Sequence, residues 1–256
     1  IDTRHIRDKA DQGDVIRLKF LDQNNRKETQ TGFMNPIVAE DLANLLHADV
    51  FVCVPITDYE VPLETLKYIK KNSKGIVIFD AHGPTNTVDV LGARHMRFWI
   101  ERDIWLPYID VLKMNLEESR CSWFEKEYDM ADLKPLHDIQ TGHLDEMAAH
   151  VLEKGVKALI VTLDSGGSAV YFKKGSAVHK EIVPSVPVQD VVDTTGCGDS
   201  FAGGLGFGLL ENPTNYIGAA RYANALGAQR TQGRTFEVFK SLEETQGMIR
   251  QTYGTV

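Results

Sequence analysis

Residues 144–163 have the sequence LDEMAAHVLEKGVKALIVTL, which joins a helical periodicity to a continuous apolar run. The apolar residues of the first half recur at the spacing of one helix face: Leu144, Met147, Ala148, Val151 and Leu152. Gly155 is placed to end this helix, and residues 158–163 form a short apolar run typical of a strand buried in a parallel sheet. The stretch therefore predicts a helix followed by a strand, the repeating unit of α/β proteins.

The same alternation extends in both directions along the chain. Upstream, the patterns predict strands at 49–54, 76–79 and 108–114, with helices at 36–47, 62–72 and 91–107. Downstream, they predict short antiparallel strands at 169–172 and 177–179 and closing helices at about 199–210 and 214–227. Such alternation implies a parallel sheet covered on both faces, with ligands bound beyond the carboxyl ends of its strands.

The first 35 residues have a different pattern. Residues 15–20 alternate apolar and charged side chains, 22–26 resemble a turn, and 29–33 are a plausible partner strand. We therefore expect a β-hairpin within residues 1–35 and an α/β core over 36–256. The apolar face of such a hairpin needs a covering surface, so we expect the hairpin to pack against a second subunit in a homodimer.

Composition limits the classes of partner. The chain has 256 residues, of which 43% are hydrophobic, as in an ordinary globular protein. Its 28 Lys and Arg against 36 Asp and Glu give a net charge of −8, which disfavours binding to nucleic acid and anionic membranes. The apolar runs are much shorter than the roughly 20 residues that cross a bilayer. The cysteines Cys53, Cys121 and Cys197 form no CxxC pair, so a reducing cytoplasm is the expected location.

The densest chemical signal is DTTGCGDSF at 193–201. Small residues directly before a helix let several backbone N–H groups converge on an anion, most often phosphate, and Gly196 and Gly198 leave room for its oxygens. Asp199 would repel such an anion, but it suits a hydroxyl that loses its proton during phosphoryl transfer. The alternative is that Asp199 only caps the helix.

Three further patterns have weaker functional interpretations. Glycines 204, 206 and 208 lie inside a predicted helix, so they are a weak dinucleotide fingerprint and the only support for an NAD-dependent oxidoreductase. Asp80, His82 and Asp89 follow no metal-ligand spacing and are expected in a loop. A basic and aromatic cluster consists of Arg94, Arg97, Trp99, Arg102 and Trp105. We expect its Trp rings to pack in the interior and its Arg groups to be solvated or paired.

Residues 193–201 resemble the carboxyl-terminal signature of the ribokinase-like, or PfkB, carbohydrate kinases. Residues 115–118, Asn-Leu-Glu-Glu, are similar to the Asn-x-x-Glu motif of that family, and 162–167 to its Thr-Leu-Gly-x-x-Gly nucleotide turn. Residues 1–6 are similar to the segment that precedes its lid strands. The resemblance implies a three-layer α/β fold with a mostly parallel central sheet and a small β lid. It makes residues 1–35 a partial β lid and 36–256 an α/β nucleotide-binding core.

The resemblance also implies an activity, the transfer of the ATP γ-phosphoryl group to a hydroxymethyl oxygen of a sugar. A nucleoside such as adenosine is the second choice of substrate, and a catalytically silent nucleotide-binding homologue is the rival from another class. By motif position, Asp199 would be the general base, and the N–H groups of Gly196, Cys197 and Gly198 would form the anion hole.

Other roles follow from the same resemblance. Asn115 and Glu118 would position Mg²⁺, and Asp193 and Thr195 would belong to a loop that binds a monovalent cation such as K⁺. The residues expected near the nucleotide are Asn115, Thr162, Gly167, Gly198 and Asn224. Without the resemblance, Asn115 is a turn residue, Glu118 a solvated acid and Asn224 an exposed helix residue.

The chain departs from the family pattern in several places. Cys197 stands where many members have Ala, and its place at a helix N-terminus predicts a lowered thiol pKa. Asp164 replaces the usual Gly, and 224–233 is about two residues shorter than in ribokinase. The family's first strand, early sugar-binding Asp and Gly-Gly motif have no counterpart before Ile1. Either the sequence omits a preceding segment, or the chain has lost sugar binding.

Overall fold

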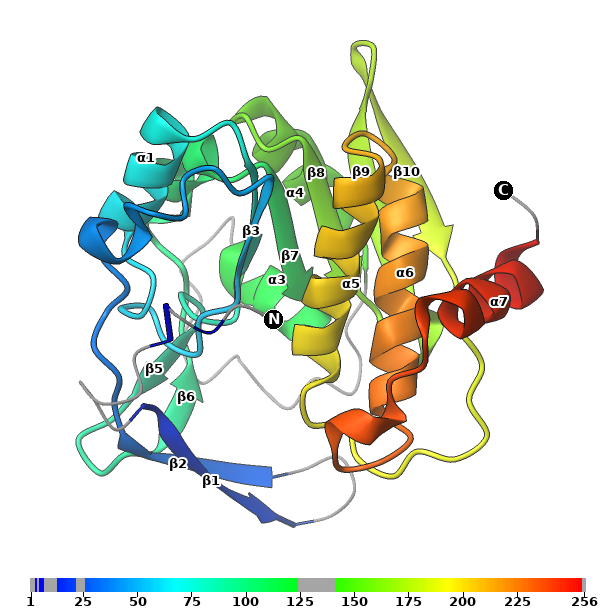
Figure 1. Ribbon diagram of the computed structural model, residues 1–256. Helices are drawn as coiled ribbons and strands as arrows, with labels where there is room; N and C mark the ends of the chain where they lie inside the picture. The colour runs from blue at the N-terminus through cyan, green and yellow to red at the C-terminus, as the bar shows by residue number, and fades with distance from the viewer. Residues whose placement is uncertain (1–2, 4, 7–12, 22–25, 124–140, 255–256) are drawn as a thin grey trace.

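A central sheet of six strands organises the computed structural model, which describes residues 3, 5–6, 13–21, 26–123 and 141–254 (Figure 1). The strands are β3 (Val50–Cys53), β4 (Ile76–Asp80), β7 (Val111–Asn115), β8 (Ala158–Thr162), β9 (Ser168–Lys174) and β10 (Ala177–Val183). Their order is β10-β9-β8-β7-β4-β3. The strands β3, β4, β7 and β8 are parallel, and β9 is antiparallel to both of its neighbours. The mostly parallel sheet and its antiparallel edge are therefore confirmed.

Helices cover both faces of this sheet. They are α1 (Leu63–Asn72), α2 (Arg102–Trp105), α3 (Leu116–Ser122), α4 (His143–Glu153), α5 (Cys197–Glu211), α6 (Tyr216–Arg230) and α7 (Leu242–Tyr253). Short 3-10 helices span Ala39–Leu42, Leu106–Tyr108, Asp164–Gly166 and Phe236–Val238.

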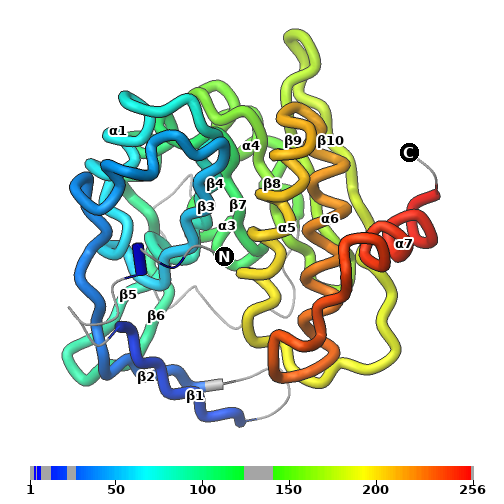
Figure 2. Tube along the Cα trace, in the orientation of Figure 1, coloured from blue at the N-terminus to red at the C-terminus, as the bar shows by residue number. Residues whose placement is uncertain are grey.

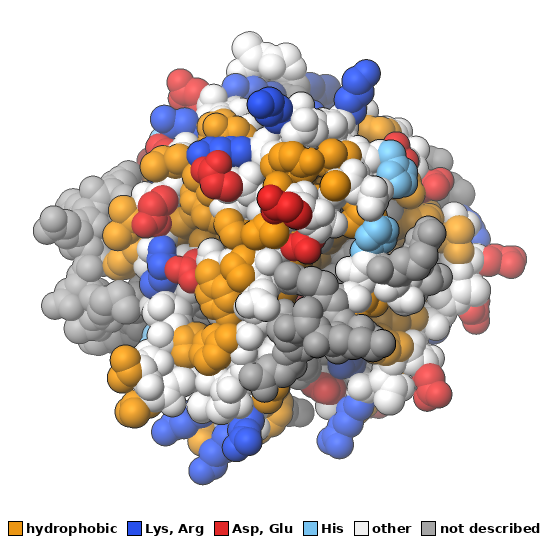
Figure 3. Space-filling view, turned by 60° about the vertical axis from the view of Figure 1, so that its left-hand side comes forward, with side chains coloured by type: hydrophobic (Ala, Val, Ile, Leu, Met, Phe, Trp, Pro, Cys, Tyr) orange, Lys and Arg blue, Asp and Glu red, His pale blue; other side chains and the backbone are white. Residues whose placement is uncertain are grey.

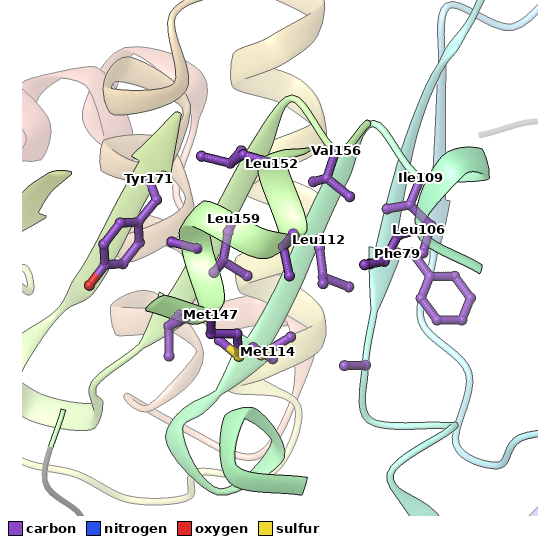
Figure 4. Packing of buried hydrophobic residues seen from close by; sticks show 14 of the residues in the cluster. Phe79, Leu106, Ile109, Leu112, Met114, Met147, Leu152, Val156, Leu159 and Tyr171 are labelled. Atoms are coloured by element: carbon purple, nitrogen blue, oxygen red, sulfur yellow. The ribbon is translucent and has the colours of Figure 1, made fainter. Parts of the chain in front are cut away.

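Successive strand residues point to opposite layers. Phe79 lies with α1 and α4 in one apolar cluster, whereas Ile78 lies with α5 and α6 in another. Figure 4 shows the first cluster, where Leu112, Met114 and Leu159 of the sheet face Met147 of α4. The result is the predicted arrangement of three layers.

Two hairpins lie at the lower end of the molecule in Figures 1 and 2, the end at which α5 begins. One pairs β1 (Val15–Phe20) with β2 (Arg26–Gly32), and the other pairs β5 (Asn86–Val88) with β6 (Arg94–Met96). The hairpins are joined because the Gln30 N–H donates to the Gly92 carbonyl at 2.8 Å. The predicted first hairpin is therefore present, with a second strand that starts earlier than expected. The predicted turn at 22–26 lies mostly outside the described residues, and so does half of the motif at 1–6.

Two predicted helices were wrong. The range 91–107 holds strand β6 and only the short helix α2, because Gly92, with φ of +83°, turns the chain back toward β5. The range 36–47 forms a 3-10 helix at Ala39–Leu42 followed by turns. Hydrogen bonds between residues three apart, such as Leu45 N–H to the Leu42 carbonyl, hold this range together. Their spacing produces an apolar pattern similar to that of an α-helix.

The glycine run in α5 has a structural explanation. A Cβ on Gly204 would lie 2.8 Å from the Cα of Ala223, and one on Gly208 would lie 2.5 Å from the Cα of Ala219. Both alanines belong to α6, so the glycines let two helix backbones approach closely. The run is therefore a packing feature, which removes the support for a dinucleotide fingerprint.

Candidate functional site

Predicted site residues from three motifs, together with Asp80, which was not predicted to belong to the site, lie at the carboxyl edge of the sheet. Asp80, Asn115 and Thr162 are the last residues of β4, β7 and β8, and Asn115 pairs with Thr162 in register. Helix α5 begins beside this edge, since a Cβ on Gly198 would lie 3.3 Å from the Nζ of Lys113 on β7. Motifs far apart in sequence therefore meet where open α/β sheets bind their ligands.

The turn before α5 has the backbone form expected of an anion site. Gly196, with φ of +82°, is the N-cap residue, and a Cβ there would lie 3.2 Å from the Nε of Arg230. No side chain caps the first turn, and Asp199 is exposed at its third position, so the capping interpretation does not describe this residue. The Cys197 N–H donates to the Thr194 carbonyl at 3.2 Å. The Cys197 N–H, one of the three groups predicted to form the anion hole, is therefore already hydrogen-bonded within the turn.

Lys113 is a functional candidate that was not predicted from the sequence. It is 4% exposed, and its Nζ lies 2.6 Å from Asp80 Oδ2, beneath Gly198. Burial alone would lower its pKa, but the charges of Asp80 and Glu118 outweigh burial and raise it, so the ammonium stays charged. A single Lys in the apolar strand 111–115 was the available signal, because a buried ammonium needs a carboxylate partner.

Asn115 and Glu118 form a capping box at the start of α3. Asn115 Oδ1 accepts from the Glu118 N–H, and Glu118 Oε2 accepts from the Asn115 N–H, both at 2.7 Å. Glu118 is 2% exposed and its Oε1 lies 2.9 Å from His82 Nδ1, so it is no solvated acid. Burial would raise its pKa, but the hydrogen bond from His82 and the charge of Lys113 lower it overall, which keeps an ionised carboxylate.

A chain of polar contacts connects Glu118 to the first hairpin. Arg94 on β6 lies 3.2 Å from His82 Nε2, and its other nitrogens donate to Glu28 Oε2 at 3.0 Å and Gln30 Oε1 at 2.8 Å. His82 satisfies both neighbours as the tautomer that donates from Nδ1 to Glu118 and accepts at Nε2 from Arg94. The hairpin is therefore tied to the same edge of the sheet as the predicted metal site.

The residues at this edge fit magnesium, which the resemblance implies. Mg²⁺ takes oxygen ligands and keeps several waters. Both oxygens of Glu118 already accept hydrogen bonds within the protein, from His82 and from the Asn115 N–H. The ionised Glu118 carboxylate is therefore suited to contact the ion through a coordinated water.

The predicted nucleotide turn follows β8. Gly167 has φ of +91°, and a Cβ there would collide with the Val183 carbonyl. Asp164, which stands where the family has Gly, has φ of +50°, so the backbone keeps the left-handed form with a residue that tolerates it. Thr162 lies at the head of this turn, opposite Ser168.

Asn224 is buried rather than exposed, with 7% of its surface accessible. Its Nδ2 donates to the carbonyls of Val183 and Pro184 at 3.2 and 3.0 Å. Asn224 thus anchors the segment that packs over Gly167, a supporting position rather than a direct ligand position.

The surroundings of Cys197 correct one prediction. Burial raises the pKa of its thiol above the ordinary value, and although the charge of Arg230 lowers it, Asp193 and Asp199 add to the rise. Two carboxylates and the loss of water therefore outweigh the helix N-terminus that predicted a lowered pKa.

The remaining sequence candidates have structural partners. Asp89 lies in the turn of the second hairpin, with its Oδ2 3.0 Å from His95 Nε2. Trp99 is 1% exposed in the core, and Arg97 donates to Asp58 at 2.6 Å. The cluster therefore packs its Trp and pairs its Arg, as predicted.

The opposite edge of the sheet also has a hollow, of about 670 Å³, lined by the starts of β3, β4 and β7. Its lining contains none of the predicted site residues. Its buried acid, Asp110, is already neutralised by Lys70 at 2.7 Å and Lys157 at 2.9 Å. We therefore assign the site to the carboxyl edge.

One face of the molecule carries side chains of both charges. In the view of Figure 3, basic side chains are dispersed among acidic and hydrophobic ones.

Among the described residues, no helix has the length and apolar character needed to cross a membrane.

Comparison with known proteins finds several relatives with kinase names, and two of them are described below. The family model described as pfkB family carbohydrate kinase matches residues 63–235. Ribokinase of Lactococcus lactis subsp. lactis (strain IL1403) is 47% identical over 202 residues, which cover 77% of this chain and 54% of that protein. The 2-dehydro-3-deoxygluconokinase of Bacillus subtilis (strain 168) is 36% identical over 86 residues, which cover 34% and 25%. The chain thus spans about half of the first relative and a quarter of the second.

Solved structures share the fold at low sequence identity. Ribokinase from Thermotoga maritima matches with a TM-score of 0.62 and 22% identity, over 92% of this chain and 69% of that chain. A Burkholderia thailandensis nucleoside kinase in complex with inosine matches with a TM-score of 0.61 and 19% identity, over 94% and 70%. A pyrophosphate-dependent kinase in the ribokinase family matches with a TM-score of 0.65 and 15% identity, over 86% and 69%.

Proposed function

Because the chain belongs to the pfkB family of carbohydrate kinases, we propose that it transfers the γ-phosphoryl group of ATP to a hydroxymethyl oxygen of a sugar. The relative that is 47% identical is named a ribokinase, which favours a sugar over a nucleoside. The observation that carries the proposal is the exposed Asp199 on the first turn of α5, directly after the left-handed Gly196.

Asp199 acts as the general base in this proposal. Its carboxylate accepts the proton of the acceptor hydroxyl as that oxygen attacks the phosphoryl group. The N–H groups of Gly196 and Gly198 face the charge that develops on the phosphoryl oxygens. Lys113 supports this role, because its ammonium lies beneath Gly198 and adds positive charge there.

In the proposed site, Asn115 and Glu118 would hold Mg²⁺, and the bound ion would supply positive charge beside the phosphates. The capping box fixes both side chains, so their oxygens need no reorganisation when nucleotide arrives. Thr162 contacts the nucleotide from the head of the turn after β8. Gly167 is buried beneath the Val183 carbonyl and shapes that turn, and Asn224 holds the covering segment in place.

A phosphorylation screen tests the function. The product of the complete gene is incubated with Mg·ATP and a panel of pentoses, hexoses and nucleosides, with pyrophosphate as an alternative donor, and products are identified by mass spectrometry. We expect one or a few sugars to gain a phosphoryl group from ATP. Phosphorylation of nucleosides alone would change the proposed substrate class from sugars to nucleosides. Binding of Mg·ATP without any product would indicate a catalytically silent homologue and contradict the proposal.

A further inference from the structure

Arg230, the last residue of α6, lies directly behind the turn that begins α5. The residue is 9% exposed, and its NH1 donates to the Gly233 carbonyl at 2.5 Å. Its NH2 lies 3.9 Å from Asp193 Oδ2, and its Nε lies 3.2 Å from where a Cβ on Gly196 would be. A guanidinium therefore fills the space between the Asp193 carboxylate, the Gly233 carbonyl and the glycine turn.

The two segments around this guanidinium are bonded to each other. The N–H groups of Val192 and Asp193 donate to the Thr231 carbonyl at 2.8 and 3.3 Å, and Gln232 Nε2 donates to the Asp190 carbonyl at 2.8 Å. The position of the segment before α5 thus depends on the same turn that carries Arg230.

Asp193 needs a positive charge beside it. Its Oδ1 accepts from the Thr195 N–H at 2.9 Å, and its Oδ2 lies 3.9 Å from the NH2 of Arg230. An ionised carboxylate so close to the glycine turn would repel the phosphates of a nucleotide unless a cation offset it. Arg230 is the buried cation that the structure places there.

We propose that the guanidinium of Arg230 takes the place of a monovalent cation at the Asp193 loop, so that phosphoryl transfer at Asp199 does not require K⁺. This inference rests on the proposed kinase function. Arg230 is a positioning residue, because it acts on the reacting groups through the turn at Gly196.

The residues present do not fit a potassium ion. K⁺ is held by oxygen ligands, and the loop offers the Asp193 carboxylate and nearby carbonyls such as that of Gly233. The Gly233 carbonyl already accepts from Arg230, and a second cation beside the guanidinium would be repelled in a half-buried site. The expectation of a K⁺ site, which rested on Asp193 and Thr195, is replaced here by a built-in cation.

A cation panel on the complete gene product tests the proposal. Turnover, KM for ATP and the melting temperature are measured in choline chloride, LiCl, NaCl and KCl at constant ionic strength. We expect turnover to vary less than about twofold across the four salts, and the melting temperature in KCl to equal that in choline chloride. Activation of tenfold or more by K⁺, or a rise in melting temperature specific to K⁺, would overturn the proposal.

Variants separate the charge of Arg230 from its packing. Arg230→Met keeps an unbranched stem in place of the aliphatic part of arginine and removes the charged guanidinium. We expect kcat in choline chloride to fall by about 10²-fold, with a smaller change in KM for ATP. Arg230→Lys keeps a charge and should regain part of the loss. The control, Arg250→Met, removes an exposed arginine of α7 that has no described contact with the Asp193 loop and should change kcat less than about threefold. Equal losses in the Met and Lys variants would show that packing alone matters and would contradict the proposal.

The melting measurement keeps this inference distinct from the proposed function. If no acceptor is phosphorylated in any salt, the kinase function fails. The dependence of wild-type melting on K⁺ still decides whether Arg230 has replaced a bound cation. If Arg230→Met does not fold, the cation panel on the wild-type protein decides the matter alone.

Discussion

Cys197 illustrates how several neighbours set the chemistry of one residue. Its position at the start of α5 favours the thiolate, whereas burial and the carboxylates of Asp193 and Asp199 oppose it and prevail. The position in the chain was visible in sequence, but the two nearby carboxylates act through the folded backbone. The place of the thiol at the helix start was therefore predicted correctly, whereas the direction of its pKa shift was predicted wrongly.

The raised pKa predicts slow labelling of Cys197 at neutral pH. We expect its rate of alkylation by iodoacetamide, followed by peptide mass spectrometry, to rise about tenfold per pH unit between pH 7 and pH 9. Mg·ATP should slow this labelling, because nucleotide would cover the turn. Cys121 serves as the internal control, because burial raises its pKa to about 12. A rate that is already constant at pH 7 would mean a lowered pKa and contradict this account.

Glu60 makes stability depend on pH. It is 4% exposed, its oxygens accept from the Ile56 N–H at 2.7 Å and the Thr57 hydroxyl at 2.9 Å, and burial together with nearby Asp14 raises its pKa to about 7. The folded state therefore keeps a proton that the unfolded chain releases near pH 4.5. The contribution to stability is present at low pH and is lost as the pH rises through 7.

We expect the free energy of unfolding, measured with urea, to fall by on the order of 2 kcal/mol between pH 5 and pH 8 through this group. Glu60→Gln should remove that dependence, because the amide keeps oxygen and shape without titrating. Glu64→Gln, on the exposed surface of α1, is the matched control and should leave the slope unchanged. The same slope in wild type and Glu60→Gln would refute the assignment.

The pairing of α5 with α6 is set by small residues. Gly208 faces the backbone of Ala219, whereas a Cβ on Gly203 of the same helix would meet no described atom within 4 Å. Gly208→Ala should therefore lower the free energy of unfolding by roughly 1–3 kcal/mol through overpacking. Gly203→Ala should raise it by up to about 1 kcal/mol, because Ala favours the helix. Equal effects of the two changes in denaturant titration would contradict the close packing.

Elements with strong periodicity were predictable, and elements set by contacts were not. Helix α4 and strand β8 agree with the patterns at 144–163, because one apolar face and one apolar run leave few alternatives. Strand β6 was missed because its pairing partner and the hairpin beneath it decide its form. Helix α7 was overlooked, although Ser241 and Glu244 form a capping box that the sequence displays.

At the scale of the molecule, the site is assembled from segments that are remote in sequence. The motif residues at 115–118, 162–167 and 193–201 could be identified from sequence because each combines Gly, Asp, Glu or Asn in a short pattern. Lys113 and Arg230 are single charged residues in ordinary surroundings, so their roles became visible only when folding placed them behind Gly198 and Gly196. The first hairpin was predicted, whereas its link to Glu118 through Arg94 was not.

The central claim is that Asp199 removes the proton of the acceptor hydroxyl, and Asp199→Asn tests it most directly. Steady-state kinetics with the best acceptor should show kcat lower by roughly 10² to 10⁴-fold, while calorimetry should show nearly unchanged affinity for Mg·ATP. Glu211→Gln, an exposed acid at the other end of α5, is the control and should leave both values unchanged. A kcat for Asp199→Asn equal to that of the wild type would contradict the account.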